Sequence, residues 1–344
     1  MSIRICQADL STNRTVIVDF IRKNLNPKFD DQFFNWLYLN HPAGSARAWL
    51  AYQNESRLIG LAAAFPRIFN VSGQVHTGWV LGDFCIDVSF RSLGPAIMLQ
   101  RACLEEARRS VALCYDFPSN TMMSVYQRLG VTTSKRFFRF VKHLSFDSLV
   151  SRILPATSIG RGISAAADTL LSLQSRPAKE RPGLEISSYD GLFGEEFTLI
   201  DLQIRNRFDI IGSRSAEEMN WRYRYRPQKQ YEVLVARQEA RLSAYLVFAC
   251  EADRALLVDV FGDPKAESMQ ELLITAIDTL RRRGIAQFQA YSLESSSLAS
   301  ILGKVGFYRR EHAPLVMIFQ NQGELGNSAG KSQSWHLTPG DRDS

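Results

Sequence analysis

The sequence predicts an α/β protein in which one fold occurs twice, each time as a mixed, mostly antiparallel sheet flanked by helices. The first observation is a repeat, because Asn35-Trp36-Leu37-Tyr38 returns 185 residues later as Asn220-Trp221-Arg222-Tyr223. The second is that each motif is followed by two β-like runs separated by a turn. The third is the length of 344 residues, which suits two domains of ~150 residues. A repeat this long indicates a duplicated domain, since solenoid units repeat every ~20–50 residues.

The repeat also predicts where the domains begin and end. We expect a first copy at residues 1–144 and a degenerate second copy at 184–320. Residues 145–183 contain several prolines around one helical segment, which is typical of a connector. Residues 321–344 are rich in Gly, Ser, Asn and Gln, and we expect a disordered tail there.

The elements of the first copy follow from hydrophobic periodicity. A strand at 3–6 precedes a helix at 12–23, in which apolar residues recur at helical spacing. A second helix, at 30–39, carries the repeated motif. Three antiparallel strands follow at 48–52, 60–70 and 79–88, with a hairpin turn at 71–74. The remaining elements are a helix at 94–109, a strand at 111–117, a short helix at 122–129, and a final strand or hairpin at 135–144. This order indicates an α/β sandwich around a mixed sheet.

Composition excludes several classes of function. The chain has a net charge of +6 and a pI near 9.1, which suits an anionic partner such as a polyphosphate cofactor. The alternating Arg and Tyr residues at 222–226 have no basic counterpart at 37–41, so we do not predict nucleic-acid binding. We expect no membrane span and no signal peptide, because apolar runs are short. Five cysteines without a close pair and five scattered histidines predict a cytoplasmic protein with reduced thiols and no metal.

The most informative segment is 81–96, which predicts a strand, a tight turn and the start of a helix. Free N–H groups and the helix dipole make such a start an anion-binding site. Gly94 has no Cβ, so a diphosphate can approach its backbone, and Pro95 suits the first turn of a helix.

Two motifs resemble the GNAT superfamily of acyl-CoA-dependent N-acyltransferases. Residues 91–96, Arg-Ser-Leu-Gly-Pro-Ala, resemble that family's (Q/R)xxGx(G/A) pyrophosphate loop. The segment from Asn120 through Tyr126 to Leu129-Gly130-Val131 resembles its Asn…Tyr…x-Gly-Phe segment, with Val131 in place of Phe. The resemblance covers almost all of the first copy, and tandem arrangements occur in the superfamily. It implies a GNAT-like fold and acetyl-CoA, or another acyl-CoA, as co-substrate.

The resemblance also implies roles for individual residues. Backbone groups near Ile86 and Val88 would bind the pantetheine between two splayed strands, and we expect both side chains in the core. The remaining residues expected to hold the cofactor are Arg91, Leu93, Gly94, Ala96 and Asn120.

Two residues are candidates for proton transfer. Tyr126 is the candidate general acid for the departing thiolate, whose pKa lies below that of a phenol. Asp83, Cys85 and Asp87 alternate onto one face of their strand, and Asp83 is the candidate general base. A water relay without a single base remains open.

The second copy lacks these features. At its loop position, 261–268, Asp263 and Glu267 would repel a diphosphate. Counting back from Gly306, the positions of Asn120 and Tyr126 hold Ser296 and Leu302. The comparison therefore predicts that the chemistry belongs to the first copy, and that Trp36 and Tyr38, which recur in both copies, are packing residues.

We expect transfer of an acetyl group to a primary amine by direct attack, since no histidine is placed to activate Cys85 as a nucleophile. The acceptor stays open among a small-molecule amine such as an amino acid, an amino sugar, and a protein lysine. Two other functions remain as alternatives: a non-catalytic module for acyl-CoA binding or protein interaction, and a Fem-type aminoacyl transferase.

Overall fold

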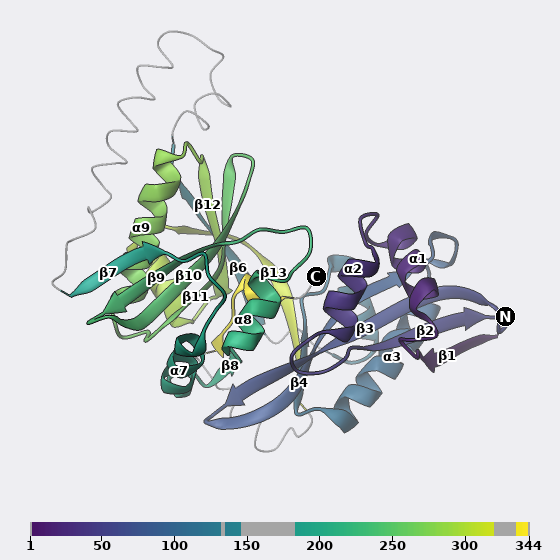
Figure 1. Cartoon of the computed structure of the whole chain (residues 1–344). Coiled ribbons are helices and arrows are strands. Elements are labelled where there is room, and N and C mark those ends of the chain that lie inside the picture. The colour runs from purple at the N-terminus through teal and green to yellow at the C-terminus, as the bar shows by residue number, and fades with distance from the viewer. Residues whose placement is uncertain (1, 132–134, 146–182, 320–334, 343–344) are drawn as a thin grey trace, which may run out of the picture.

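The structure is a computed structural model that describes residues 2–131, 135–145, 183–319 and 335–342. Figure 1 shows two α/β halves side by side, joined by one continuous sheet. Parallel pairing is confined to three ladders among the described residues, and all other ladders are antiparallel. The predicted α/β class with a mostly antiparallel sheet is therefore confirmed.

The first half contains five strands of the sheet. They are β1 (Ile3–Gln7), β2 (Arg47–Gln53), β3 (Arg57–Val71), β4 (Gln74–Ile86) and β5 (Leu113–Asp116). Its helices are α1 (Arg14–Asn24), α2 (Asp31–Phe34), α3 (Leu93–Ser110) and α4 (Asn120–Arg128), with helical turns η1 (Asn35–Leu39) and η2 (Val88–Phe90). The core on the α1 and α2 face of the sheet is separate from the core on the α3 and α4 face.

The second half contains a similar succession of helices and strands, with β6, β8 and β14 in addition. Its strands are β6 (Lys135–His143), β7 (Leu184–Ser188), β8 (Ile210–Gly212), β9 (Glu232–Gln238), β10 (Arg241–Glu251), β11 (Arg254–Gly262), β12 (Gln287–Leu293), β13 (Tyr308–Phe319) and β14 (Trp335–His336). Its helices are α7 (Glu195–Ile204), α8 (Ala216–Tyr223), α9 (Ser268–Arg282) and α10 (Ser297–Lys304), with turns η3 (Arg205–Arg207) and η4 (Pro339–Asp341).

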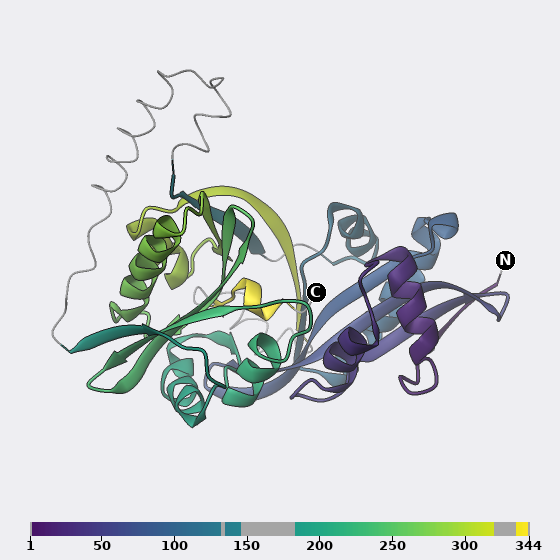
Figure 2. The ribbon, with the colours of Figure 1, turned by 45° about the horizontal axis from the view of Figure 1, so that its top comes forward.

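The two halves exchange strands, which corrects one prediction. The order is β1-β2-β3-β4-β5-β13-β6-β12-β11-β10-β9-β7. The final strand of the first copy, β6, therefore lies inside the second half, between β12 and β13. Its Phe138 and Phe140 are buried in the core against α9. β13 pairs with β6 through its first part and with β5 from Val316 onward, and it arches between the halves in Figure 2.

The C-terminal segment corrects a second prediction. Residues 335–342, expected to be disordered, are ordered: β14 pairs with β8, and Trp335 and Leu337 are buried. The backbone carbonyl of Asp341 accepts a 2.6 Å hydrogen bond from the hydroxyl of Tyr115 on β5. Most of the expected connector, 146–182, and the Gly- and Ser-rich stretch 320–334 lie outside the described residues.

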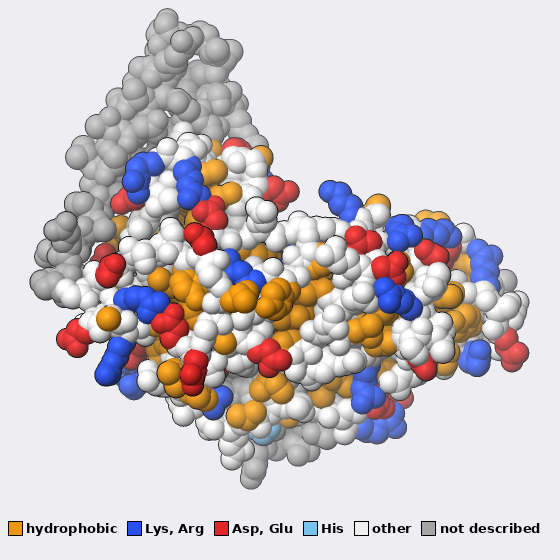
Figure 3. Space-filling model, viewed as in Figure 1, with side chains coloured by type: hydrophobic (Ala, Val, Ile, Leu, Met, Phe, Trp, Pro, Cys, Tyr) orange, Lys and Arg blue, Asp and Glu red, His pale blue; other side chains and the backbone are white. Residues whose placement is uncertain are grey.

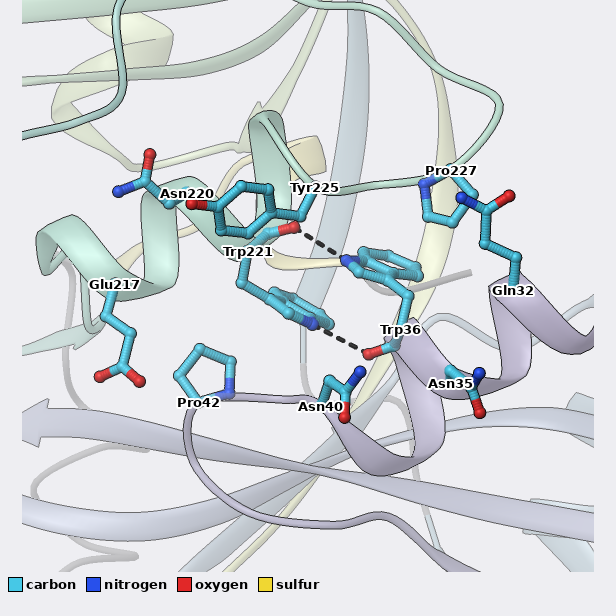
Figure 4. Close-up of a pocket in the computed structure, with 10 residues that line it drawn as sticks. All are labelled: Gln32, Asn35, Trp36, Asn40, Pro42, Glu217, Asn220, Trp221, Tyr225 and Pro227. Carbon is cyan, nitrogen blue, oxygen red and sulfur yellow. Dashed lines mark hydrogen bonds between the residues drawn. The ribbon is translucent and has the colours of Figure 1, made fainter.

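The repeated motifs meet across the boundary between the halves. The indole rings of Trp36 and Trp221 stack with centroids 4.6 Å apart. Each indole N–H donates to the backbone carbonyl of the other tryptophan, at 2.8 and 2.9 Å, as Figure 4 shows. This reciprocal contact relates the copies by a local two-fold axis, and it agrees with the interpretation of Trp36 as a packing residue.

A buried ionic cluster lies beside the tryptophans. Glu218 of α8 accepts hydrogen bonds from Arg67 of β3 and from Arg222, the latter at 2.5 Å, and all three side chains are buried. His41 lies 3.4 Å from Arg67, and burial lowers its pKa to about 2, so the ring stays neutral. The cluster joins a cation of the first half to a carboxylate of the second.

We predict that residues 1–150 alone will aggregate or remain unfolded. In this fragment β6 loses both of its neighbours and β5 loses β13, so two sheet edges and the apolar face of β6 are exposed. The measurement is size-exclusion chromatography and circular dichroism of the fragment beside the whole chain. A monomeric fragment that unfolds cooperatively would contradict the prediction.

Candidate functional site

The strands β4 and β5 separate after a short parallel ladder. Their last pair is Val80 with Tyr115, and past it β4 continues to Ile86 with no strand on that side among the described residues. The register of β4 against β3 shifts at the same place, and Asp83 adopts a left-handed backbone with φ of 45°. A bulge bends a strand and weakens its pairing. The two strands therefore diverge past Val80 and Tyr115.

The start of α3 lies beyond the end of β4. Gly94 is exposed, and no heavy atom lies within 4 Å of where a Cβ would stand. Ser92 precedes the helix in an extended conformation, and its side chain does not cap the helix. Leu93 is the first helical residue, and Arg91 is exposed. The helix start can therefore receive an anion.

The other residues expected to bind the cofactor differ in how much of their surface is exposed to solvent. Ile86 and Ala96 are buried, as expected. Val88 is 65% exposed, so its expected place in the core is wrong, because β4 ends at Ile86 and Val88 belongs to the turn η2. Asn120 is the exposed first residue of α4, which is capped by the side chain of Ser119.

Tyr126 faces inward. Its side chain is fully buried, and its hydroxyl donates a 2.6 Å hydrogen bond to Asp116 at the end of β5. The same oxygen accepts a 3.0 Å hydrogen bond from the Gln100 amide of α3. Burial raises the pKa of Tyr126 well above its usual value, with the Asp116 charge adding to the shift. Sequence reasoning missed Asp116 and Gln100; a lone carboxylate at the end of the strand at 111–117 was the available signal for Asp116.

Asp83 lies on the other face of the sheet. Its carboxylate accepts a 2.8 Å hydrogen bond from Tyr38, which belongs to the core under α1 and α2. Cys85 lies in that core, and Asp87 pairs with Lys23 of α1 at 2.9 Å, so the predicted alternation is confirmed. Tyr126 belongs to the core under α3 and α4. The structure does not bring the two predicted catalytic residues together.

The Asp83 pair has a counterpart in the second copy. Tyr223 stands 185 residues after Tyr38, and Asp259 occupies the place of Asp83 when the ladders of β4 and β11 are matched. The hydroxyl of Tyr223 lies 3.3 Å from the Asp259 carboxylate. The copy with the degenerate loop keeps this Tyr–Asp pair, so the pair by itself does not indicate catalysis.

A pocket of about 580 Å³ lies between the halves. Its lining consists of five pairs of residues 185 positions apart: Gln32 and Glu217, Asn35 and Asn220, Trp36 and Trp221, Asn40 and Tyr225, Pro42 and Pro227. Hydrophobic side chains gather along the middle of the face seen in Figure 3, where the halves meet. The lining has amides, one carboxylate and no Lys or Arg, so it suits a neutral or cationic ligand.

Two negative observations apply to the described residues. Across 2–131, 135–145, 183–319 and 335–342, no group of three or more His, Cys, Asp or Glu side chains is arranged to hold a metal ion. Within the same ranges, no helix has both the length and the apolar character needed to cross a membrane.

Comparison with solved structures shows that 93% of this chain has a fold similar to acyltransferase structures. A GCN5-related N-acetyltransferase from Anabaena variabilis matches with a TM-score of 0.67 and 14% identity, over 93% of this chain and 73% of that one. A conserved Enterococcus faecalis protein of unknown function matches equally well, with 12% identity over 93% and 73%. Saccharomyces cerevisiae N-myristoyltransferase with bound myristoyl-CoA matches with a TM-score of 0.57 and 15% identity, over 93% and 83%.

No family model and no curated protein matches the sequence. At these identities the likeness concerns the fold, and the fold is that of the GNAT-related acyltransferases, as the resemblance of the two motifs implied.

Proposed function

We propose that this protein is an N-acyltransferase that binds one acyl-CoA in its first copy. The supporting observation is that β4 and β5 diverge past Val80 and Tyr115, and that α3, which follows β4 in the chain, has an exposed start at Gly94. In this proposal Arg91, Gly94 and the backbone around 93–96 hold the diphosphate. The pantetheine lies along β4 near Ile86 and Val88, and Asn120 borders the site at the start of α4.

The second copy is proposed to bind no cofactor. Its strands β11 and β12 also separate after three pairs, but the place next to them is filled by the chain itself. Thr338 donates a 3.0 Å hydrogen bond to Asp259 of β11, and Arg214 pairs with Asp341 at 2.9 Å. A Cβ on Gly340 would clash with Tyr223, so the fit is tight. The ordered C-terminal segment thus closes the second opening.

The proposed reaction is direct attack of a primary amine on the thioester. Attack forms the N–C bond, the C–S bond breaks, and CoA leaves as a thiolate that takes up the proton lost by the attacking amine. Burial raises the pKa of Cys85 far above its usual value, which disfavours a covalent acyl-cysteine route. Acetyl-CoA is the first donor to test, and the acceptors to test are amino sugars, small amines such as amino acids, and lysine side chains.

Calorimetry with acetyl-CoA tests the proposal, and we expect one molecule bound per chain. A thiol-release assay over glucosamine, spermidine and a lysine peptide then identifies the acceptor class. Binding with no turnover for any amine would favour the non-catalytic module. Absence of acyl-CoA binding together with turnover of an aminoacyl-tRNA would establish the Fem-type alternative. Two molecules bound per chain would contradict the assignment of the cofactor to the first copy.

A further inference from the structure

Three polar side chains from three elements meet where β4 and β5 separate. Asp116 is the first residue of β5 beyond the last β4–β5 pair. Its carboxylate accepts from Tyr126 of α4 at 2.6 Å, and the Tyr126 oxygen accepts from Gln100 of α3 at 3.0 Å. The hydrogen bonds run in one direction, from the amide to the phenol to the carboxylate.

The three residues of this chain differ in burial. Gln100 and Tyr126 are buried, whereas Asp116 keeps part of its surface exposed. A buried phenol that already donates to a carboxylate cannot give the same proton to a ligand without breaking that bond. Asp116, at the point where β4 and β5 diverge, is therefore the residue of this chain best placed to meet a substrate.

The second copy shows what replaces these residues. Six buried positions of α3 (Ala96, Leu99, Gln100, Cys103, Leu104 and Ala107) have the same spacing as six buried positions of α9 (Met269, Leu272, Leu273, Ala276, Ile277 and Leu280). Gln100 thus corresponds to Leu273. The ladders pair Leu113 with Gly78 and Gln287 with Arg254, so Asp116 corresponds to Ala290.

Counting back from Gly306 in the second copy places Leu302 at the position that Tyr126 holds in the first copy. Leu273, Ala290 and Leu302 are all buried in the apolar core of the second half. The copy without a cofactor loop has thus lost all three polar residues together, although it keeps the Tyr223–Asp259 pair. The cluster of Gln100, Tyr126 and Asp116 therefore occurs only in the copy that has the loop, whereas the Tyr–Asp pair occurs in both copies.

We propose that the Asp116 carboxylate is the catalytic base of the first copy, and that Tyr126 and Gln100 are residues that position it. This inference rests on the proposed acyl transfer. The amine nitrogen attacks the thioester carbon and gives one proton to Asp116 as the N–C bond forms. The C–S bond then breaks, and Asp116 returns that proton to the thiolate, which leaves Asp116 ionised and needs no further reactant.

The surroundings of Asp116 suit a group that exchanges protons near neutrality. Desolvation raises its pKa to about 6, while the Tyr126 hydrogen bond and the Arg342 charge act in the opposite direction. The other titratable groups near it on its face are the thiols of Cys114 on β5 and Cys103 on α3. Burial raises the pKa of both thiols, so they stay neutral. A base of this pKa is mostly ionised at pH 7 and is lost below about pH 6.

The test is Asp116→Asn in the full-length chain, assayed by thiol release from acetyl-CoA with the amine found most active. We expect kcat to fall about 10²–10⁴-fold, with acetyl-CoA affinity within about threefold of the parent. The parent's pH–rate profile should bend downward below pH about 6, and the bend should be absent from the variant. Asp253→Asn, at an exposed turn of the second half, is the matched control and should change neither quantity.

Tyr126→Phe separates a positioning residue from a general acid. Removing the hydrogen bond that Tyr126 donates raises the pKa of Asp116, so the bend should move to higher pH while kcat falls less than in Asp116→Asn. A larger loss in Tyr126→Phe than in Asp116→Asn would overturn the proposal in favour of Tyr126 as the acid. Full activity of Asp116→Asn with loss of activity in Asp83→Asn would overturn it in favour of Asp83. In either case the parent's turnover would still support the proposed function.

Discussion

Replacing Gly94 by Glu is expected to abolish acyl-CoA binding and to leave the fold intact. Gly94 is exposed at the start of α3, and a Cβ there meets no atom within 4 Å, so the protein tolerates a side chain. A diphosphate bound at this helix start would meet both the side chain and its negative charge. Like charges placed together cost several kcal/mol, which corresponds to at least ~100-fold weaker binding. Calorimetry with acetyl-CoA measures the loss.

The second copy offers the matched control. When the buried positions of α3 and α9 are aligned, the position of Gly94 is held by Glu267, so Gly94→Glu makes the first loop like the second. Glu267→Gln should leave acetyl-CoA affinity unchanged. Gly94→Ala separates the effect of the side chain from that of the charge. Undiminished binding by Gly94→Glu would show that the diphosphate lies elsewhere.

Replacing Glu218 by Gln is expected to destabilise the protein by about 3–5 kcal/mol, because it leaves the buried Arg67 and Arg222 without this carboxylate. Removing one partner of a buried ion pair costs more than the pair contributes, since the remaining charge stays desolvated. Arg67 belongs to the first half and Glu218 to the second, so the loss of this ion pair should weaken the contact between the halves. Equilibrium unfolding in urea, followed by tryptophan fluorescence, measures the change.

The control for this prediction is an exposed ion pair. Asp31 pairs with Arg14 at 2.8 Å, with both side chains substantially exposed, so Asp31→Asn should cost less than about 1 kcal/mol. If Glu218→Gln costs no more than Asp31→Asn, the buried cluster does not hold the halves together. A separate early transition in Glu218→Gln would show that the halves have become independent.

The periodicity of the sequence alone predicted the features that depend on residues close together along the chain. Asp83 and Cys85 of β4 share a face because side chains alternate along a strand, and Asp87, just past the end of β4, contacts Lys23 of α1 on the same face. The start of α3 near Gly94 also follows from local residue types. The expectation for Val88 failed because the strand ended two residues earlier, in a turn that alternation does not detect.

The sequence by itself predicted a duplicated fold, the helices and strands of each copy, and a cofactor loop in the first copy. Only the tertiary structure decided that β6 crosses into the other half, that residues 335–342 pack against β8 and β11, and that Asp116, Tyr126 and Gln100 meet. The reason is physical. Side-chain alternation and helix signals depend on residues a few positions apart, whereas strand partners and buried hydrogen bonds depend on segments that are distant along the chain.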